Sequence, residues 1–240
     1  MRFAIFGDIH ANLEAFEVVL ADARDESCEA YICLGDVVGY NANPRECLDR
    51  VRALNCPVVK GNHDDYAASE STLESFNPLA EVAIQWTRDQ LSGEEKRWLA
   101  SLPLTLEVGG FTIVHATLED PGGWSYVLNQ LDAAASFSRQ TTDLCFFGHT
   151  HSPRAYIKDS SVVGLSYENL TLHKGKKYFI NVGSVGQPRD GDWKAAYVLF
   201  DEERRNIRLK RLRYDLPRAQ EKILACGLPP RLAERLAFGK

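Results

Sequence analysis

The sequence lacks any apolar run long enough to span a bilayer, which takes about 20 consecutive residues. The apolar stretch at residues 2–6 is too short for the core of a signal peptide, and Asp8 and His10 follow it at once. We therefore expect a cytoplasmic protein with no membrane partner.

Paired cysteines and a basic surface are also missing. The six cysteines are scattered and none forms a C-x-x-C pair, so we expect reduced thiols that ligate no metal. A net charge of −5 and a pI near 5.7 argue against a protein that binds a nucleic-acid polymer through its phosphates. The one basic concentration, residues 202–218, contains acidic residues as well, and we interpret it as the solvated side of a strand and a helix.

What the first quarter of the chain does contain is a regular alternation of strand and helix patterns. Apolar strand patterns alternate with amphipathic helix patterns in the order 2–6, 12–26, 30–34, 43–54 and 57–61. This order predicts a parallel sheet with helices on its faces. Each strand pattern ends in glycine followed by a polar residue, and ligands of open α/β sheets bind at the carboxyl ends of strands. We therefore expect these three ends to converge on one site.

The pattern changes after this region. Residues 77–101 are predicted to be helical, with a break at Ser92-Gly93. Further on, Gly109-Gly110 separates two strand-like segments, which is a hairpin signal. A helical stretch near 129–139 then leads to the apolar segment LCFFG.

The last third of the chain predicts several short strands followed by two helices. The strand-like pieces lie between residues 153 and 213, and the amphipathic segments are 217–225 and 229–238. No repeat or long linker divides the chain. We expect a single domain over residues 1–240 with an α/β fold, a four-layer α-β-β-α sandwich of two mixed β-sheets flanked by helices.

The histidines share a position that points to a site. Five of the six lie just past a predicted strand end, beside glycine, aspartate or asparagine: His10, His63, His115, His149 and His151. One such histidine would more often be structural, but five in the same setting argue for chemistry. The sixth, His173, is interpreted as a surface residue.

Hard oxygen donors accompany these histidines, namely Asp8, Asp36, Asn62 and Asp64. Mixed carboxylate, amide and imidazole ligands suit Mn, Fe or Zn in a catalytic role, whereas a structural zinc site favours paired cysteines. The candidates outnumber one coordination shell, and a site with two ions about 3.5–4 Å apart would use them. We therefore expect two divalent transition metal ions as cofactors.

Five motifs in a fixed order make the pattern specific. They are GDIH (7–10), GDVVGY (35–40), GNHDD (61–65), VHA (114–116) and GHTH (148–151). Together they resemble the calcineurin-like metallophosphoesterases. Residues 77–87 and 181–191 extend the likeness to the small bacterial phosphoesterases of this superfamily, in the diadenosine tetraphosphatase-like branch.

The resemblance implies a role for each metal-ligating position. It assigns Asp8, His10 and His151 to the first metal, Asn62, His115 and His149 to the second, and Asp36 to both, with one carboxylate oxygen on each ion. The ions would supply a bridging hydroxide that attacks phosphorus and would neutralise charge on the phosphoryl oxygens. His63 corresponds to the family histidine that binds no metal, and it would protonate the leaving oxygen or stabilise the phosphate.

The sequence departs from the family's protein phosphatases directly after the bridging aspartate. Where those carry an Asp-Arg-Gly motif, this chain has Gly39, Tyr40 and Asn41. The acid that orients His63 must therefore come from elsewhere, and Asp64 or Asp65 could supply it.

The arginine that holds the phosphate must also come from elsewhere, and Arg189 or Arg45 could supply it. The loop 181–191 is either a glycine-shaped strand connection or part of the substrate wall, and 37–44 invites the same two interpretations. As candidate substrate-binding residues the two loops offer Tyr40, Asn41, Ser184 and Arg189.

These features favour a dinuclear-metal phosphoesterase for small phosphorylated substrates of nucleotide type, either a phosphodiester or a molecule like diadenosine tetraphosphate. The alternatives are a phosphomonoesterase or protein serine/threonine phosphatase and, from another class, a non-catalytic scaffold that keeps the fold. A DNA-repair nuclease shares the metal motifs, but a net charge of −5 offers little attraction for DNA. The sequence does not indicate an oligomeric state.

Overall fold

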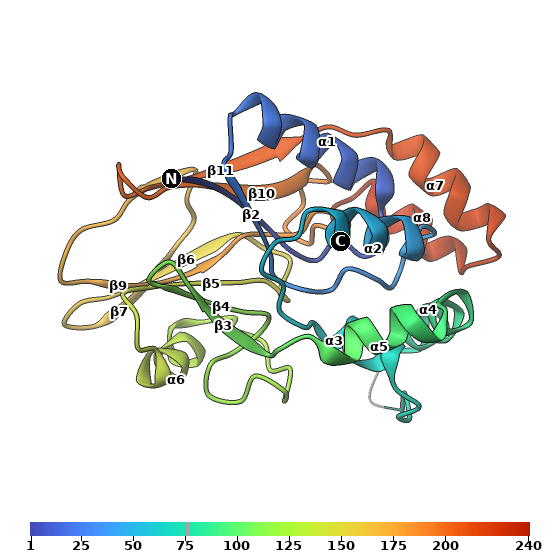
Figure 1. The fold of residues 1–240 in the computed structure, drawn as a ribbon, viewed down its shortest axis with the longest axis horizontal. Coiled ribbons are helices and arrows are strands. Elements are labelled where there is room, and N and C mark those ends of the chain that lie inside the picture. The colour runs from blue at the N-terminus through green and yellow to red at the C-terminus, as the bar shows by residue number, and fades with distance from the viewer. Residues whose placement is uncertain (75–76) are drawn as a thin grey trace.

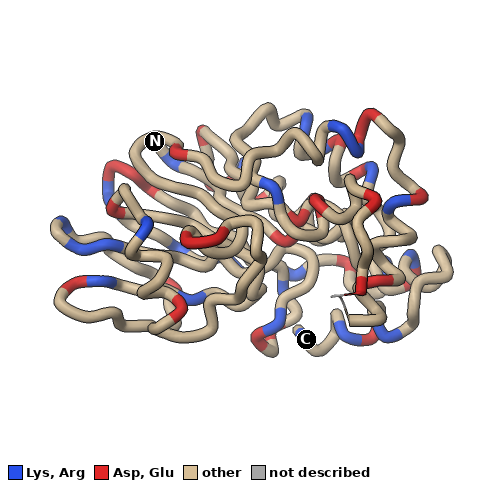
Figure 2. The backbone as a smooth tube through the Cα atoms, turned by 90° about the horizontal axis from the view of Figure 1, so that it is seen from below, with Lys and Arg blue, Asp and Glu red and all other residues tan. Residues whose placement is uncertain are grey.

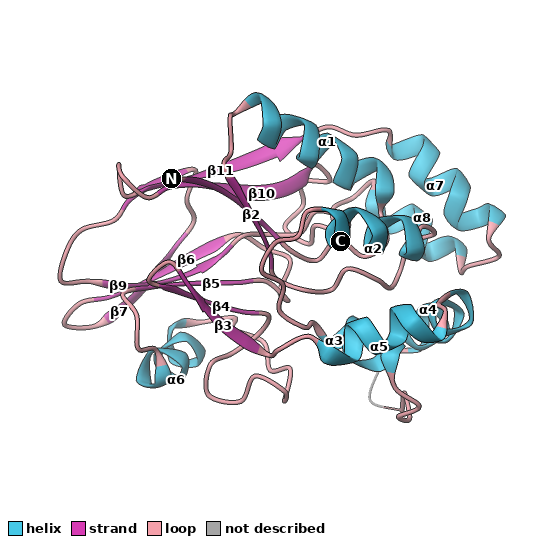
Figure 3. Cartoon of the chain, in the orientation of Figure 1, coloured by secondary structure: helices cyan, strands magenta, loops and turns pink. Residues whose placement is uncertain are grey.

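The structure, a computed structural model, describes residues 1–74 and 77–240 (Figure 1). Two β-sheets pack face to face, and helices cover the outer face of each (Figure 3). The expected α/β fold, a sandwich of two mixed sheets between helical layers, is therefore confirmed.

The first sheet combines strands from the two ends of the chain. Its order is β2 (Ala30–Cys33), β1 (Arg2–Phe6), β10 (Ala195–Asp201), β11 (Asn206–Leu212) and β8 (Asn169–Thr171). β1 and β2 are parallel, whereas β10 and β11 run antiparallel to their neighbours. The parallel sheet predicted from the first quarter of the chain is thus extended by a C-terminal hairpin.

The second sheet is formed by the middle of the chain. Its order is β3 (Thr105–Val108), β4 (Phe111–Val114), β5 (Leu144–Phe147), β9 (Lys177–Asn181), β6 (Arg154–Lys158) and β7 (Val162–Leu165). β4, β5 and β9 are parallel, so the ends of β4 and β5 point to the same edge. The hairpin predicted at Gly109-Gly110 joins β3 to β4.

The described part of the chain contains eight helices. They are α1 (Leu13–Asp25), α2 (Pro44–Ala53), α3 (Asn62–Ala68), α4 (Pro78–Gln90), α5 (Gly93–Ser101), α6 (Gln130–Arg139), α7 (Leu216–Ala225) and α8 (Pro230–Leu236). α1, α2, α7 and α8 pack on the outer face of the first sheet, and α6 covers the second (Figure 1). The predicted break between α4 and α5 is confirmed, and Ser92 caps α5 by accepting a hydrogen bond from the backbone of Glu95.

Side-chain alternation along β1 explains how one strand serves two cores. Phe3 and Ile5 face the space between the sheets, whereas Ala4 and Phe6 face the helices. Burial of both faces explains why the strand reads as a continuous apolar run.

The prediction of a strand at residues 57–61 is wrong. Only an isolated parallel bridge between Cys33 and Val58 forms there. The backbone N–H of Lys60 donates instead to the carbonyl of Pro103, and helix α3 starts at Asn62. Helix α3 itself was not expected from the sequence.

No helix in the part of the chain that the structure describes has both the length and the apolar character needed to cross a bilayer.

Removing one aromatic side chain from the space between the sheets tests how this core is packed. Phe146 is fully buried, and its ring centroid lies 5.5 Å from Phe111 and 5.6 Å from Phe200. We expect Phe146→Ala to lower the free energy of unfolding by about 3–5 kcal/mol because it leaves a cavity. Urea denaturation measures this loss, with Leu131→Ala at an 82% exposed position as the control. An equal effect of the two substitutions would contradict this account of the core.

Candidate active site

The ends of four strands place acidic and imidazole side chains at one edge of the sandwich. Asp8 follows β1, Asp36 follows β2, His115 follows β4 and His149 follows β5. All four are buried. The site lies at the carboxyl ends of strands, where open α/β sheets bind ligands.

The potential metal ligands fall into two groups. The first contains Asp8, His10, Asp36 and His151, and the second contains Asp36, His115 and His149. Within each group the ligand atoms lie within 4.8 Å of one another. Asp36 belongs to both groups, and the two histidines of the GHTH motif are divided between them.

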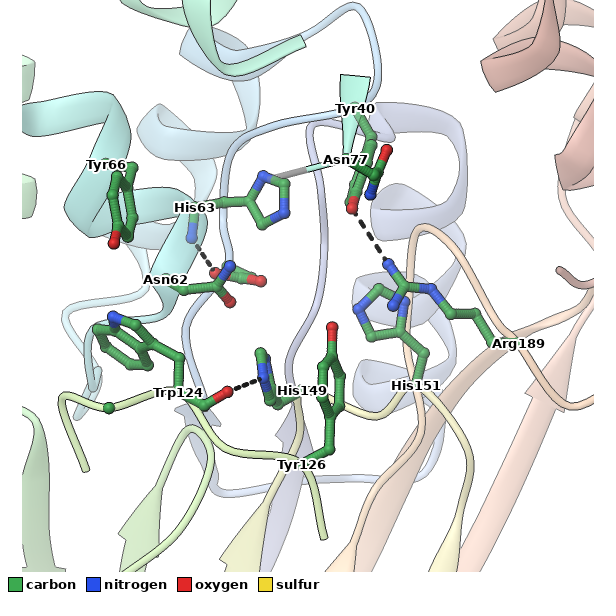
Figure 4. Close-up of a pocket in the computed structure, with 12 residues that line it drawn as sticks. Tyr40, Asn62, His63, Tyr66, Asn77, Trp124, Tyr126, His149, His151 and Arg189 are labelled. Atoms are coloured by element: carbon green, nitrogen blue, oxygen red, sulfur yellow. Dashed lines mark hydrogen bonds between the residues drawn. The ribbon is translucent and has the colours of Figure 1, made fainter. Parts of the chain in front are cut away.

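The two carboxylate oxygens of Asp36 have different surroundings. Oδ2 lies 3.5 Å from Nε2 of His10 and 3.4 Å from Nε2 of His115, so this one oxygen faces both groups. Oδ1 accepts the backbone N–H of His63 at 2.8 Å (Figure 4). Oδ2 thus faces both ligand groups, whereas Oδ1 also fixes the main chain at the start of helix α3.

Each imidazole in the two groups faces a backbone carbonyl with one ring nitrogen. The pairs are His10 Nδ1 with Val38 O at 3.1 Å, His115 Nδ1 with Leu34 O at 2.7 Å, His149 Nε2 with Trp124 O at 2.8 Å, and His151 Nδ1 with Gln187 O at 2.6 Å. A carbonyl only accepts hydrogen bonds, so in a neutral ring the nitrogen beside it carries the proton. The other nitrogen then turns a lone pair towards the site, as metal-ligating histidines do.

These inward nitrogens lie close to one another. His10 Nε2 is 3.1 Å from His151 Nε2, and His115 Nε2 is 3.2 Å from His149 Nδ1. His10 and His151 both have pKa values lowered by burial, so these two neutral rings would oppose lone pair to lone pair, which is repulsive. A cation bound to both nitrogens turns this repulsion into attraction, so the donor geometry fits metal ions.

Asn62 adds a side-chain oxygen that is also suited to binding a metal ion. Its Oδ1 is buried and has no hydrogen-bond donor among the residues that the structure describes. A buried amide oxygen without a donor is costly, and coordination of a cation would satisfy it. Its position at the start of α3 places it in the pocket beside His63 (Figure 4).

Two carboxylates of the site favour positive charge at His115. Burial alone would lower the pKa of His115, but the carboxylates of Asp36 and Asp8 raise it to about 9. By contrast, burial and the neighbouring His115 lower the pKa of His149 to about 3. The pair of carboxylates thus stabilises a cation at this position, whether a proton or a metal ion.

The backbone of the site is uncommon for residues other than glycine. Asp8, His10, Asp36, His149 and His151 have φ values of 51°, 47°, 51°, 66° and 58°. The left-handed region is sparsely populated by such residues, and its occurrence at five neighbouring positions indicates a functional constraint. Gly148 leaves room for the Asp8 carboxylate, because a Cβ at this position would lie 2.5 Å from Oδ2 of Asp8.

His63 lies in the pocket between two rings. Its centroid is 4.4 Å from that of Tyr40 and 4.7 Å from that of His10. Burial, with a smaller contribution from Arg189, lowers the pKa of His63 to about 4, so the ring is neutral at pH 7. Gly39 is required beside it, because any Cβ there would collide with Nδ1 of the imidazole.

The two acids considered for orienting His63 have other partners. The Asp64 carboxylate accepts backbone hydrogen bonds from Val37, Val38 and Gly61 at 2.9, 3.3 and 3.1 Å. It thereby ties the loop after β2 to the start of α3, and burial raises its pKa to about 7. Asp65 forms an ion pair with Lys60 at 3.2 Å.

Of the two arginines considered for the phosphate, the structure places only Arg189 at the pocket. Arg189 Nη2 lies 3.4 Å from the Tyr40 hydroxyl (Figure 4). The same nitrogen lies 3.0 Å from Oε1 of Gln187. Arg45 instead pairs with Glu95 of α5 at 3.1 Å, and it is not among the described residues that line the pocket.

Asn41 and Ser184 lie beneath the pocket and hold the backbone of the loops that carry the ligands. Asn41 Nδ2 donates to the carbonyl of His10 at 2.7 Å, and Ser184 Oγ donates to that of Asp8 at 2.8 Å. Neither side chain is among the described residues that line the pocket. The geometry therefore indicates positioning, not the substrate contact that the sequence suggested. Tyr40 does line the pocket.

Five residues that line the pocket were not expected from the sequence, namely Tyr66, Asn77, Gly123, Trp124 and Tyr126. The cavity has a volume of about 360 Å³, and Figure 4 shows the four larger side chains around it. The ring of Tyr126 stacks on that of His149 at 4.3 Å with an interplanar angle of 15°. A signal for Trp124 and Tyr126 existed, namely two aromatic residues in the glycine-containing segment PGGWSY shortly after the VHA motif.

Comparison with known proteins identifies the class of this site. Residues 1–205 match the family described as the calcineurin-like phosphoesterase superfamily domain. With the fold and the buried Asp/His cluster, this match defines a metal-dependent phosphoester hydrolase. The chain belongs to the calcineurin-like phosphoesterase superfamily.

Individual relatives agree with this assignment. An uncharacterized protein of Methanocaldococcus jannaschii is 40% identical over 99% of this chain and 98% of its own. The crystal structure of a metallophosphoesterase from Sphaerobacter thermophilus is 40% identical, with a TM-score of 0.90 over 100% of this chain and 99% of that one. A symmetrical bis(5'-nucleosyl)-tetraphosphatase of Aromatoleum aromaticum is 32% identical over 52% of this chain and 46% of its own.

Replacing Gly148 tests whether its small size keeps Asp8 in place. We expect Gly148→Ala to push the Asp8 carboxylate from its position and to weaken Mn²⁺ binding about tenfold or more, as loss of a supporting group around a metal does. Isothermal titration calorimetry of the metal-stripped protein with Mn²⁺ measures this change. Gly93→Ala is the control, because a Cβ there would come no closer than 3.4 Å to another residue. Equal Mn²⁺ affinity in the two folded variants would contradict the assigned role of Gly148.

Proposed function

We propose that the two groups of ligands bind two divalent transition metal ions, Mn, Fe or Zn, with Asp36 shared between them. The first ion would be held by Asp8, His10 and His151, and the second by Asn62, His115 and His149. The observation that carries this proposal is the pair of short distances between inward-facing ring nitrogens, 3.1 and 3.2 Å. When bound, two such ions supply an activated water at neutral pH and neutralise charge on the phosphoryl oxygens.

The chain's own residues would position the phosphoester between the ions and the pocket. Arg189 offers a guanidinium for a non-bridging phosphoryl oxygen, and Tyr40 holds that guanidinium through its hydroxyl. His63 is neutral at pH 7, so it offers a ring N–H to the phosphoryl group or the leaving oxygen. The backbone N–H of His63 bonds Asp36, so the same residue also fixes the shared carboxylate.

We propose nucleotide-type substrates for this enzyme. The pocket carries four aromatic side chains, Tyr40, Tyr66, Trp124 and Tyr126, and planar bases stack on such rings. The relative from Aromatoleum aromaticum, named as a symmetrical bis(5'-nucleosyl)-tetraphosphatase, supports the same substrate class. These four aromatic side chains support nucleotide substrates over the substrates of the alternative function, a phosphomonoesterase or protein serine/threonine phosphatase.

Two further alternatives receive less support. A non-catalytic scaffold has no need to bury the seven candidate metal-ligating side chains together with His63, and all eight are buried in this chain. A nuclease acting on a polymer would benefit from a basic stripe, but lysine and arginine alternate with acidic residues along the described chain (Figure 2).

A cytoplasmic location fits the six cysteines, all of which are free thiols.

Two substitutions separate metal binding from proton or hydrogen-bond donation. We expect Asp36→Asn to remove the shared charge and to abolish both metal occupancy and turnover. We expect His63→Asn to retain the metals while the rate falls about 100-fold or more. Metal content by plasma mass spectrometry and hydrolysis of bis-p-nitrophenyl phosphate with Mn²⁺ measure the two effects.

The control for this pair is Asp65→Asn, which removes a carboxylate that pairs with Lys60 at 3.2 Å. It should leave metal content unchanged. An active, metal-loaded Asp36→Asn protein would rule out the shared position of Asp36, and an unaltered rate for His63→Asn would remove His63 from the reaction.

A substrate panel tests the nucleotide proposal. We expect the Mn²⁺-loaded enzyme to hydrolyse diadenosine tetraphosphate or cyclic nucleotides with a higher kcat/KM than a phosphoserine peptide. Trp124→Ala should raise KM for the nucleotides more than for p-nitrophenyl phosphate if the ring stacks on the base. Activity confined to the phosphopeptide would favour the phosphatase alternative.

A further inference from the structure

A second pocket adjoins the active-site pocket, and Asn77 lines both. Among the residues described, three of its lining residues are basic, Arg231, Arg235 and Lys240, and one is acidic, Glu234. The basic residues belong to α8 and the segment that follows it. The three basic residues lie outside the sequence motifs that carry the candidate metal ligands.

Arg235 connects this second pocket to the active site through Tyr40. Its guanidinium carbon lies 5.8 Å from the centroid of the Tyr40 ring, and that of Arg189 lies 5.7 Å from the same centroid. Two guanidinium groups, one from the loop before β10 and one from α8, therefore gather around a single pocket residue.

Neither guanidinium forms an ion pair with an acidic side chain of the described chain. Arg189 contacts the Tyr40 hydroxyl and Oε1 of Gln187, and Arg235 Nε donates to the main-chain oxygen of Lys240 at 2.5 Å. Arginines elsewhere on the surface do form ion pairs, for example Arg45 with Glu95. Burial and the nearby Arg189 both lower the pKa of Arg235.

The backbone holds this arrangement in place. The N–H of Gly191 donates to the carbonyl of Gly239 at 3.0 Å, so the loop that carries Arg189 is tied to the end of the α8 segment. A fixed group of guanidinium cations suits a multiply charged anion, because each offers several N–H donors to its oxygens.

We propose that Arg235, with Arg231 and Lys240, forms a second anion subsite that binds a further phosphoryl group of the substrate while the reacting phosphoryl group lies at Asp36 and His63. This inference rests on the proposed function, because it takes the first pocket as the place of phosphoester cleavage. It narrows the substrate class to molecules with at least two phosphoryl groups in a chain, such as nucleoside polyphosphates. Phosphomonoesters would use the first pocket alone.

Binding of inorganic anions tests the subsite without any hydrolysis. Isothermal titration calorimetry would compare tripolyphosphate with orthophosphate on the metal-stripped protein. We expect the wild type to bind tripolyphosphate more tightly, and Arg235→Gln to lower the ratio of the two affinities about tenfold or more, as expected for the loss of a charged hydrogen-bond pair. Arg235→Lys, which keeps the charge but not the planar fork, should give an intermediate ratio.

Kinetics of the Mn²⁺-loaded enzyme give the second measurement. Arg235→Gln should lower kcat/KM for adenosine diphosphate relative to adenosine monophosphate about tenfold, with most of the change in KM. Arg204→Gln is the matched control, at a surface position paired with Asp201. It should leave unchanged both the ratio of the two anion affinities and the ratio of the two kcat/KM values.

The outcomes separate the two proposals. If the wild type hydrolyses no phosphoester, the proposed function fails, but the affinity ratio on the metal-stripped protein still decides the subsite. An equal ratio of tripolyphosphate to orthophosphate affinity in Arg235→Gln and Arg204→Gln would overturn the proposed subsite. A lower melting temperature of Arg235→Gln with an unchanged ratio would overturn it as well, because Arg235 would then only support the fold.

Discussion

The carboxylate of Asp36 is the group on which the site depends. One oxygen accepts the backbone N–H of His63, and the other lies within 3.5 Å of ring nitrogens from both ligand groups. A single side chain therefore joins helix α3, the first sheet through His10 and the second sheet through His115. Two ligand groups so close together repel each other unless cations lie between them, and the shared carboxylate provides the negative charge that those cations need.

The sandwich supplies the rigidity that this arrangement requires. Loops after β1, β2, β4 and β5 bring the ligands together, and several of these residues have positive φ values that free chains rarely adopt. Burial of apolar side chains on both faces of β1 and between the sheets stabilises those loops indirectly. Asp64 contributes more directly, since its carboxylate accepts three backbone N–H groups around the site. These hydrogen bonds fix the positions of the loops around the site.

The distribution of charge and aromatic rings divides the surroundings of the site into two parts. Tyr66, Trp124 and Tyr126 form a wall suited to a planar group. On the α8 side, Arg189 and Arg235 approach the ring of Tyr40, and neither pairs with an acidic side chain of the described chain. This asymmetry fits a substrate with a base at one end and a chain of phosphates at the other.

The sequence by itself determined the fold class and the types of the candidate metal-ligating residues, because strand periodicity and strand-end motifs are local. It did not determine which oxygen of Asp36 faces the ligands, that Asn41 and Ser184 support backbone, or that residues 57–61 make only an isolated bridge. Those features depend on hydrogen bonds between segments far apart in the chain. The approach of Arg235 to Tyr40 is of the same kind, since only tertiary packing brings α8 to a loop nearly 200 residues earlier.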